Sequence, residues 1–281
     1  MDRLQEILAK FGSATSFDLS PKEYEQFKVD GLNNTVGNRN EEDGYDCPIC
    51  KNKGTVFKVI DFGDGTYSHC ASDCKCAEVR KSITRMKRSG LKDIIKDYTF
   101  DKFVDTEPWQ KAIKQAAMDY AKNPDGWFAL CGQSGSGKTH LCTAVCREFL
   151  LSGKKVVYML WRDEIVKIKE AAQSGDSSLQ EILERYKTAD VLYIDDLFKT
   201  GKNQFNEMVK PSVADINYAF EIINYRYNNP KLLTIISSEL SEEELLDIDE
   251  AIGGRVYERA QTFTIAKSRD RNYRIRKAVT L

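Results

Sequence analysis

The stretch that decides the fold is WFALCGQSGSGKTHLC, residues 127–142. It starts with an apolar run of strand length, passes through the loop G-x-x-x-x-G-K-T at 132–139, and ends in a pattern typical of a helix. Glycines in such a loop let backbone N–H groups turn toward phosphates, and the following helix presents its positive N-terminal end to them. The stretch therefore predicts a nucleotide site between a strand and a helix.

The loop also predicts which groups hold ATP and Mg²⁺. Lys138 is expected to reach the β- and γ-phosphates and to take part in catalysis, and the Thr139 hydroxyl is expected to bind Mg²⁺. The cofactor-binding residues that this stretch predicts are Gly132, Gln133, Ser134, Gly135, Ser136, Gly137, Lys138, Thr139 and His140.

A further motif, VLYIDD, occupies residues 191–196. Four apolar residues of a buried strand end there in two adjacent aspartates, and the metal of a phosphate loop needs a carboxylate opposite the threonine. We expect Asp195 to coordinate Mg²⁺ through water. We expect Asp196 to orient or activate the water that attacks ATP, which makes it a catalytic residue.

A third apolar run, TIISSEL at 234–240, ends in polar residues. In a parallel sheet, the carboxyl end of this strand faces the same crevice as the loop and the aspartates. Ser237, Ser238 and Glu239 are therefore candidates for sensing the γ-phosphate, and Ser238 is the one that we include among the cofactor-binding residues.

Two arginines follow in IGGRVYERA, residues 252–260. Arg255 and Arg259 lie four residues apart on one predicted helix face. They can form ion pairs within the subunit, or they can reach the nucleotide of a neighbouring subunit.

Strands and helices alternate around these motifs. Further strands are predicted at 155–160, 189–195 and 231–237, and a helix is predicted at 107–122. This alternation of strands and helices predicts an α/β fold in which helices cover both faces of a mostly parallel sheet. We place a domain boundary near residues 92–97, with an N-terminal domain at 1–92 and an ATPase domain at 93–281.

Five cysteines lie within thirty residues in the N-terminal domain. The pattern is C-x2-C, nineteen residues, then C-x3-C-x-C, and tetrahedral zinc requires four thiolate or imidazole ligands. We predict a zinc module at about 45–76 with these ligands: Cys47, Cys50, Cys74 and Cys76. Cys70 and the adjacent His69 remain alternative ligands for the second pair. The other three cysteines, Cys131, Cys142 and Cys146, have apolar neighbours and are predicted to be small core residues.

Charge and hydropathy exclude some classes of function. The chain has 42 Lys and Arg against 43 Asp and Glu, so no overall field draws it onto nucleic acid. Basic side chains do gather at 75–92, in a predicted helix at 77–89, and at 267–277, where they form solvated faces or contact phosphates. No apolar run approaches the roughly 20 residues of a membrane span. The N-terminus lacks the apolar core of a signal peptide, so we expect a cytoplasmic protein without a membrane partner.

The order of these elements resembles that of an AAA+ ATPase, and more narrowly that of the DnaC/DnaI-type helicase loaders of bacteria and their phages. The resemblance spans about residues 98–276. The segments that carry it are CGQSGSGKTHL, VVYMLWRDEI, VLYIDDLFK, TIISSEL, GGRVYERA and NYRIR.

This resemblance implies roles for the arginines and for the acids. Arg259 matches the catalytic arginine finger, with Arg255 as the alternative, and Arg274 matches the second sensor and binds the cofactor. Asp196 stands where many AAA+ proteins carry Glu, which implies slow, regulated hydrolysis. Glu239 stands where relatives often carry Asn, so this chain departs from the family at the first sensor.

The resemblance also implies partners. A loader of this type would grip a hexameric DnaB-type replicative helicase with its N-terminal domain, self-associate on the helicase ring, and help to place the helicase on single-stranded DNA. Such loaders carry a small zinc module before the ATPase, which supports Cys74 and Cys76 as ligands. The alternative is an IstB-type transposition helper ATPase, which acts on a transposase and duplex DNA and usually lacks the zinc module.

Overall fold

The computed structural model describes residues 19–86, 94–175, 178–201, 204 and 209–276. The chain divides into two compact units, Met1–Ala77 and Glu78–Leu281. This division comes earlier in the chain than the boundary expected near residues 92–97. The rest of the predicted basic helix at 77–89, beyond Met86, lies outside the described residues.

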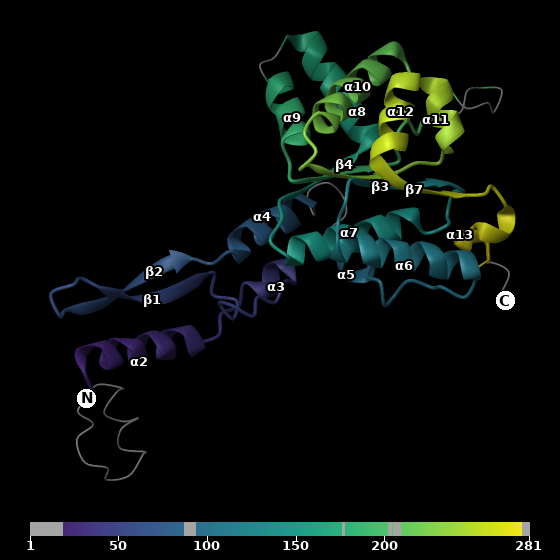
Figure 1. Cartoon of the computed structure of the whole chain (residues 1–281). Coiled ribbons are helices and arrows are strands. Elements are labelled where there is room, and N and C mark those ends of the chain that lie inside the picture. Colours follow the sequence, from purple (N-terminus) through teal and green to yellow (C-terminus); the bar gives the residue numbers. More distant parts are fainter. Residues whose placement is uncertain (1–18, 87–93, 176–177, 202–203, 205–208, 277–281) are drawn as a thin grey trace. The chain divides into compact units, whose positions relative to one another are not determined.

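The N-terminal unit contains two helices and a hairpin, α2 (Pro21–Asn34), α3 (Asn40–Asp43), β1 (Thr55–Asp61) and β2 (Tyr67–Asp73) (Figure 1). Ser20 and Glu23 form a capping box that starts α2. The two strands pair antiparallel from Thr55 opposite Asp73 to Asp61 opposite Tyr67. Asn33 fixes α2 to the hairpin, because its side chain exchanges two hydrogen bonds of 3.0 Å with the backbone of Phe57.

The second unit is an α/β domain. Its strands are β3 (Trp127–Gly132), β4 (Val156–Leu160), β5 (Val191–Asp195), β6 (Leu233–Ser237) and β7 (Ala260–Ile265). Its helices are α4 (Cys76–Met86), which begins in the first unit, α5 (Ile94–Asp97), α6 (Pro108–Lys122), α7 (Lys138–Leu151), α8 (Trp161–Ser174), α9 (Ser178–Lys187), α10 (Val213–Tyr227), α11 (Glu242–Ile248), α12 (Glu250–Arg259), the 3₁₀ turn η2 (Arg269–Arg271) and α13 (Tyr273–Arg276).

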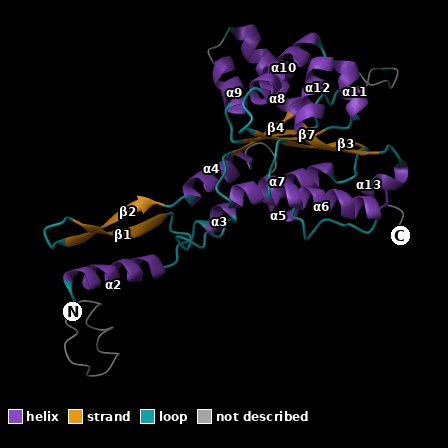
Figure 2. Cartoon of the chain, viewed as in Figure 1, coloured by secondary structure: helices purple, strands orange, loops and turns teal. Residues whose placement is uncertain are grey.

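The five strands form one parallel sheet in the order β4-β5-β6-β3-β7. Helices α6 and α7 cover one face, and α8 to α12 cover the other (Figures 1 and 2). The predicted α/β fold is confirmed, including the strands expected within 127–131, 155–160, 189–195 and 231–237. Strand β7 was not predicted.

The core lies in the sheet and against it. All six residues of β3 and all five of β5 and of β6 are buried. A strand buried on both faces reads as a continuous apolar run, which explains why these strands are visible in the sequence. Because the strands are parallel, β3, β5 and β6 bring their carboxyl ends to one edge of the sheet, where the phosphate loop and the acidic residues follow.

Candidate functional site

The phosphate loop lies between β3 and α7, as predicted. Gly132 has φ +92°, and a Cβ on it would lie 2.1 Å from the Ile265 carbonyl oxygen, so only glycine fits there. The Gly132 N–H donates to the Leu240 carbonyl (3.0 Å) and the Gln133 N–H to the Ile265 carbonyl (2.9 Å). The ends of β6 and β7 therefore hold the start of the loop.

Lys138 begins α7 and is buried, with 5% of its side chain exposed. Its ammonium donates to the carbonyls of Gly132 (2.9 Å) and Gln133 (2.7 Å). Burial lowers the pKa of Lys138, and the negative charges of Glu239 and Asp196 oppose that shift. The lysine is thus held by the loop and is available to a phosphate that enters it.

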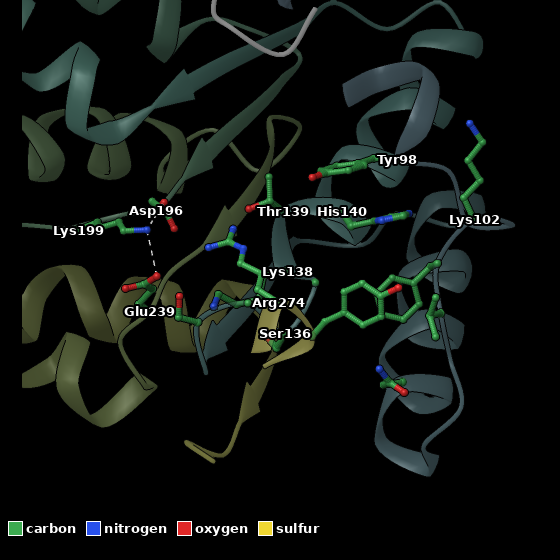
Figure 3. Close-up of a pocket in the computed structure, with 17 residues that line it drawn as sticks. Tyr98, Lys102, Ser136, Lys138, Thr139, His140, Asp196, Lys199, Glu239 and Arg274 are labelled. Carbon is green, nitrogen blue, oxygen red and sulfur yellow. Dashed lines mark hydrogen bonds and ion pairs between the residues drawn. The ribbon is translucent and has the colours of Figure 1, made fainter. Parts of the chain in front are cut away.

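A cavity of about 280 Å³ opens beside the loop (Figure 3). It is lined by the loop, by Asp196 directly after β5, and by residues near both ends of the unit. Its lining residues are Tyr98, Lys102, Phe103, Val104, Gln110, Ser134, Gly135, Ser136, Gly137, Lys138, Thr139, His140, Asp196, Lys199, Glu239, Tyr273 and Arg274.

Asp195 is buried and accepts four side-chain hydroxyls. Thr139 (3.1 Å), Tyr193 (2.7 Å) and Ser237 donate to its Oδ1, and Tyr158 donates to its Oδ2 (2.9 Å). Burial and the charge of Asp195 raise the pKa of both tyrosines, which keeps them protonated as donors. The Thr139 hydroxyl and the Asp195 carboxylate are adjacent hard oxygen ligands, which is the donor set that Mg²⁺ prefers.

Asp196 faces the cavity from a turn with an unusual backbone. Its φ is +57°, and its N–H donates to the Ser237 hydroxyl at 3.0 Å. The Lys199 ammonium lies 2.8 Å from Asp196 Oδ2 and 3.0 Å from Glu239 Oε1. Burial raises the pKa of Asp196, and the hydrogen bond from Lys199 opposes that shift.

The three sensor candidates point in different directions. Ser237 hydrogen-bonds Asp195, and Glu239 lines the cavity. The hydroxyl of Ser238 is fully buried and donates to the Leu197 carbonyl at 2.9 Å. Ser238 therefore lies away from the cavity, and this placement does not support its predicted role in cofactor binding.

The three predicted arginines are also separated. Arg274 lines the cavity, next to Tyr273, whose N–H donates to the Gly135 carbonyl at 2.9 Å. Arg255 donates to Asn224 Oδ1 (3.1 Å) and stacks over two aromatic rings. Arg259 donates to the Pro230 carbonyl at 3.3 Å. Neither Arg255 nor Arg259 lines the nucleotide cavity of its own chain.

Sequence reasoning missed the connector before α6 as part of this site. Tyr98 stacks on His140 with ring centroids 4.5 Å apart, and Phe103 meets His140 edge-on at 5.3 Å (Figure 3). His140 Nε2 lies 2.8 Å from the Thr99 carbonyl oxygen. The segment YTFDKF at 98–103 contains three aromatic residues, which favour burial, but nothing in the sequence indicates what they cover. Lys199 was also missed.

The four predicted zinc ligands come together in the N-terminal unit. The sulfur atoms of Cys47, Cys50, Cys74 and Cys76 all lie within 4.8 Å of one another, with 3.7 Å between Cys47 and Cys74 and 3.6 Å between Cys50 and Cys76. Zinc–sulfur bonds of about 2.3 Å in a tetrahedron require sulfur atoms about 3.8 Å apart. The four thiols therefore fit a zinc ion.

The turn that contains the first pair is shaped for this purpose. Lys51, Asn52 and Gly54 have φ of +48°, +68° and +83°. The Gly54 N–H donates to Cys50 Sγ at 3.2 Å, and the Cys47 N–H donates to Asn52 Oδ1 at 2.8 Å. Backbone donors to sulfur stabilise the thiolate, which is the form that binds a metal.

The alternative ligands lie outside this group. Cys70 is on β2 opposite Lys58, and His69 Nδ1 lies 2.9 Å from a carboxylate oxygen of Glu25. Cys131, Cys142 and Cys146 are completely buried in the second unit, as expected of small core residues.

The sheet order, the phosphate loop and the acids after β5 define a P-loop ATPase of the AAA+ class. The chain belongs to the family of IstB-like ATP binding proteins, whose model matches residues 73–260. No helix within the described ranges is long and apolar enough to span a membrane.

Individual proteins show the same likeness. The chain is 34% identical to the phage-like element PBSX protein XkdC of Bacillus subtilis over 235 residues, which cover 79% of this chain and 82% of XkdC. It is 26% identical to the replicative helicase loader DnaC of Escherichia coli over 132 residues, 46% of this chain and 54% of DnaC. The crystal structure of the DnaC helicase loader shares the fold, with a TM-score of 0.53 at 20% identity over 62% of this chain and 99% of that one.

Proposed function

We propose that this ATPase is a helicase loader, which binds a hexameric DnaB-type replicative helicase and helps to deliver it onto single-stranded DNA in the cytoplasm. The observation that carries the proposal is the N-terminal unit with its four clustered thiols. That cluster begins at Cys47, ahead of the family match at 73–260, so the chain adds a separate compact unit to the ATPase. Likeness to a protein named as a replicative helicase loader supports the choice of partner.

The proposal assigns a role to each residue of the site. Backbone groups of the loop and Lys138 bind the ATP phosphates, and Thr139 and Asp195 hold Mg²⁺, which neutralises phosphate charge. Asp196 accepts a proton from the water whose oxygen attacks the γ-phosphorus, and the bond to ADP breaks. The connector at 98–103 and His140 enclose the nucleotide, and Arg274 contacts it from the C-terminal side.

The N-terminal and C-terminal parts of the chain have separate functions in this proposal. Residues 1–92 hold the helicase on a module built around zinc, and residues 93–281 bind ATP and single-stranded DNA. A boundary near 92 keeps α4 whole, because α4 begins at the ligand Cys76 and runs to Met86. Copies of the chain associate on the helicase ring, so that Arg259 of one copy reaches the nucleotide of the next.

The test is binding of the purified full chain to the replicative helicase of the source cell. We expect a stable complex, and ATP-dependent transfer of the helicase onto a closed single-stranded circle. Lys138→Ala is expected to abolish tight ATP binding and transfer and to leave the complex with the helicase intact. Absence of a complex under all nucleotide conditions would contradict the proposal.

Two fragments of the chain test which part of it binds the helicase. Residues 1–92 should bind the helicase with or without ATP. Residues 93–281 should bind ATP and single-stranded DNA, with affinity that falls as salt rises because the basic side chains displace counterions from phosphates. If the helicase binds only the 93–281 fragment, the division of tasks is wrong.

The second candidate is an IstB-type transposition helper, which the family match favours. Such a protein would bind a transposase and duplex DNA in place of the helicase and single strands. The same binding experiment, with transposase and duplex DNA as the alternative ligands, separates the two candidates.

A further inference from the structure

The turn after β5 folds a lysine back onto the acid that we assign to water activation. Asp196 and Phe198 have φ of +57° and +59°, a region that side-chain-bearing residues rarely adopt. The Lys199 N–H donates to the Asp196 carbonyl at 2.9 Å and closes the turn.

Packing holds this turn in place. Phe198 is buried and meets the Trp161 ring edge-on at 5.3 Å. The Leu197 N–H donates to the Ser237 carbonyl (2.9 Å), and the Ser238 hydroxyl donates to the Leu197 carbonyl (2.9 Å). Strained backbone persists only where its surroundings determine it, and such sites are often functional.

The ammonium of Lys199 links two carboxylates at the wall of the nucleotide cavity. It lies 2.8 Å from Asp196 Oδ2 and 3.0 Å from Glu239 Oε1, and all three side chains line the cavity (Figure 3). They are one-fifth to one-third exposed, so Lys199 can change partners. Lys138 donates to loop carbonyls, and Lys199 is the lysine that pairs with Asp196.

We propose that Lys199 is a positioning residue that detects the γ-phosphate. Without a γ-phosphate, Lys199 pairs with Asp196 and occupies the carboxylate oxygen that would accept a proton from water. A γ-phosphate brings further negative charge into a cavity that already contains two carboxylates. It attracts Lys199 and releases Asp196, while Glu239 keeps the lysine at the cavity wall.

The Lys199–Glu239 pair thus performs the discrimination between ATP and ADP. The inference rests on the proposed role of Asp196 and is independent of the proposed helicase partner. Its test is nucleotide binding by the full chain, measured with fluorescent derivatives of ADP and of a non-hydrolysable ATP analogue in the presence of Mg²⁺.

Lys199→Met should weaken binding of the ATP analogue about tenfold or more, which is the effect of one lost charge-assisted hydrogen bond. ADP affinity should stay within about twofold of wild type, because ADP has no γ-phosphate to contact. Lys199→Arg should recover part of the discrimination. The matched control is Lys167→Met, since Lys167 pairs with Glu164 at 2.6 Å outside the cavity lining and should change neither affinity.

Asp196→Asn separates this inference from the role of Asp196. It removes the competing carboxylate, so binding of the ATP analogue should tighten relative to ADP, whereas turnover should be lost. If Asp196→Asn retains turnover, the proposed water-activating role fails. If Lys199→Met keeps the wild-type ratio of analogue to ADP affinity, or weakens both nucleotides alike, the proposed detection by Lys199 is wrong.

Discussion

Arg226 is completely buried, and its guanidinium donates hydrogen bonds to five acceptors, while no carboxylate of the described residues forms an ion pair with it. Its acceptors are the Thr234 hydroxyl and the backbone carbonyls of Tyr186, Lys187, Ala189 and Leu233. The side chain therefore donates hydrogen bonds to carbonyls at the carboxyl end of α9. It also connects this helix to the segment before β5 and to β6.

Removal of this guanidinium should destabilise the ATPase unit. Arg226→Met would remove the hydrogen bonds to these five buried acceptors, so we expect the free energy of unfolding to fall by about 3 to 5 kcal/mol. Arg147→Met is the matched control, because Arg147 is 38% exposed beside Glu148 and should change stability by less than about 0.5 kcal/mol. Urea unfolding of the full chain measures both. Equal stability of the two variants would show that the hydrogen bonds of Arg226 add nothing.

His140 predicts a dependence of stability on pH. Burial lowers the pKa of His140 below its usual 6.5, with the Thr99 carbonyl acting in the opposite sense. Between the lowered pKa and 6.5 the unfolded chain binds more protons than the folded chain, so stability is lost as pH falls through this window.

His140→Gln removes this titration and can still donate to Thr99. Its melting temperature should therefore fall less than that of wild type between about pH 7.5 and about pH 5.5. Parallel melting curves of the two proteins measure the difference. An identical fall in both would show that His140 does not contribute.

The residues of the phosphate loop and Asp195 with Asp196 could be predicted because their chemistry depends on local spacing. Tyr98 and Lys199 could not, because only the fold brings residue 98 beside residue 140 and turns residue 199 toward the cavity. Ser238 illustrates a different limit. Ser238 lies just beyond the end of β6, where strand alternation no longer indicates the direction of a side chain, and its hydroxyl turns to the Leu197 carbonyl.

Among the elements, β7 shows why one strand of five escaped prediction. It lies at the edge of the sheet, next to β3, and its sequence AQTFTI mixes polar and apolar residues. Only Ile265 is buried, whereas Gln261 and Thr264 are exposed and the other three residues are half-buried. An edge strand with polar side chains lacks the continuous apolar run by which the inner strands were recognised.

The turn at 47–54, the hairpin and the start of α4 contribute the four thiols, so metal binding and folding of this unit should be coupled. The purified protein should contain one zinc ion per chain. Cys47→Ser or Cys50→Ser should release it and increase amide hydrogen exchange in β1 and β2. Cys70→Ser is the control and should retain the metal. Metal-free protein with unchanged exchange would show that the cluster is only a set of buried thiols.

At the scale of the molecule, Arg259 provides a test of whether copies of the chain assemble, because it does not line the nucleotide cavity of its own chain. If it acts on a neighbour's γ-phosphate, Arg259→Ala should lower turnover by about 10³-fold or more and spare ATP binding. A mixture with Lys138→Ala chains should regain activity, since each supplies what the other lacks. Arg255→Ala in the same mixture tests the alternative finger. Steady-state hydrolysis measures each combination, and no recovery in either mixture would remove support for a role between subunits.

During synthesis on the ribosome, the strand that precedes the phosphate loop is made long before the two strands that flank it in the sheet. β3 ends at residue 132, but it is flanked by β6 and by β7, which ends at residue 265. A ribosome that adds about 5 to 20 residues per second needs roughly 7 to 27 seconds for the residues between. Gln133 lacks the Ile265 carbonyl throughout that interval, and Gly132 lacks the Leu240 carbonyl for most of it. We therefore expect that nucleotide does not stabilise the nascent chain until β7 has been made, and that the apolar strands made earlier stay without their full set of neighbours until then.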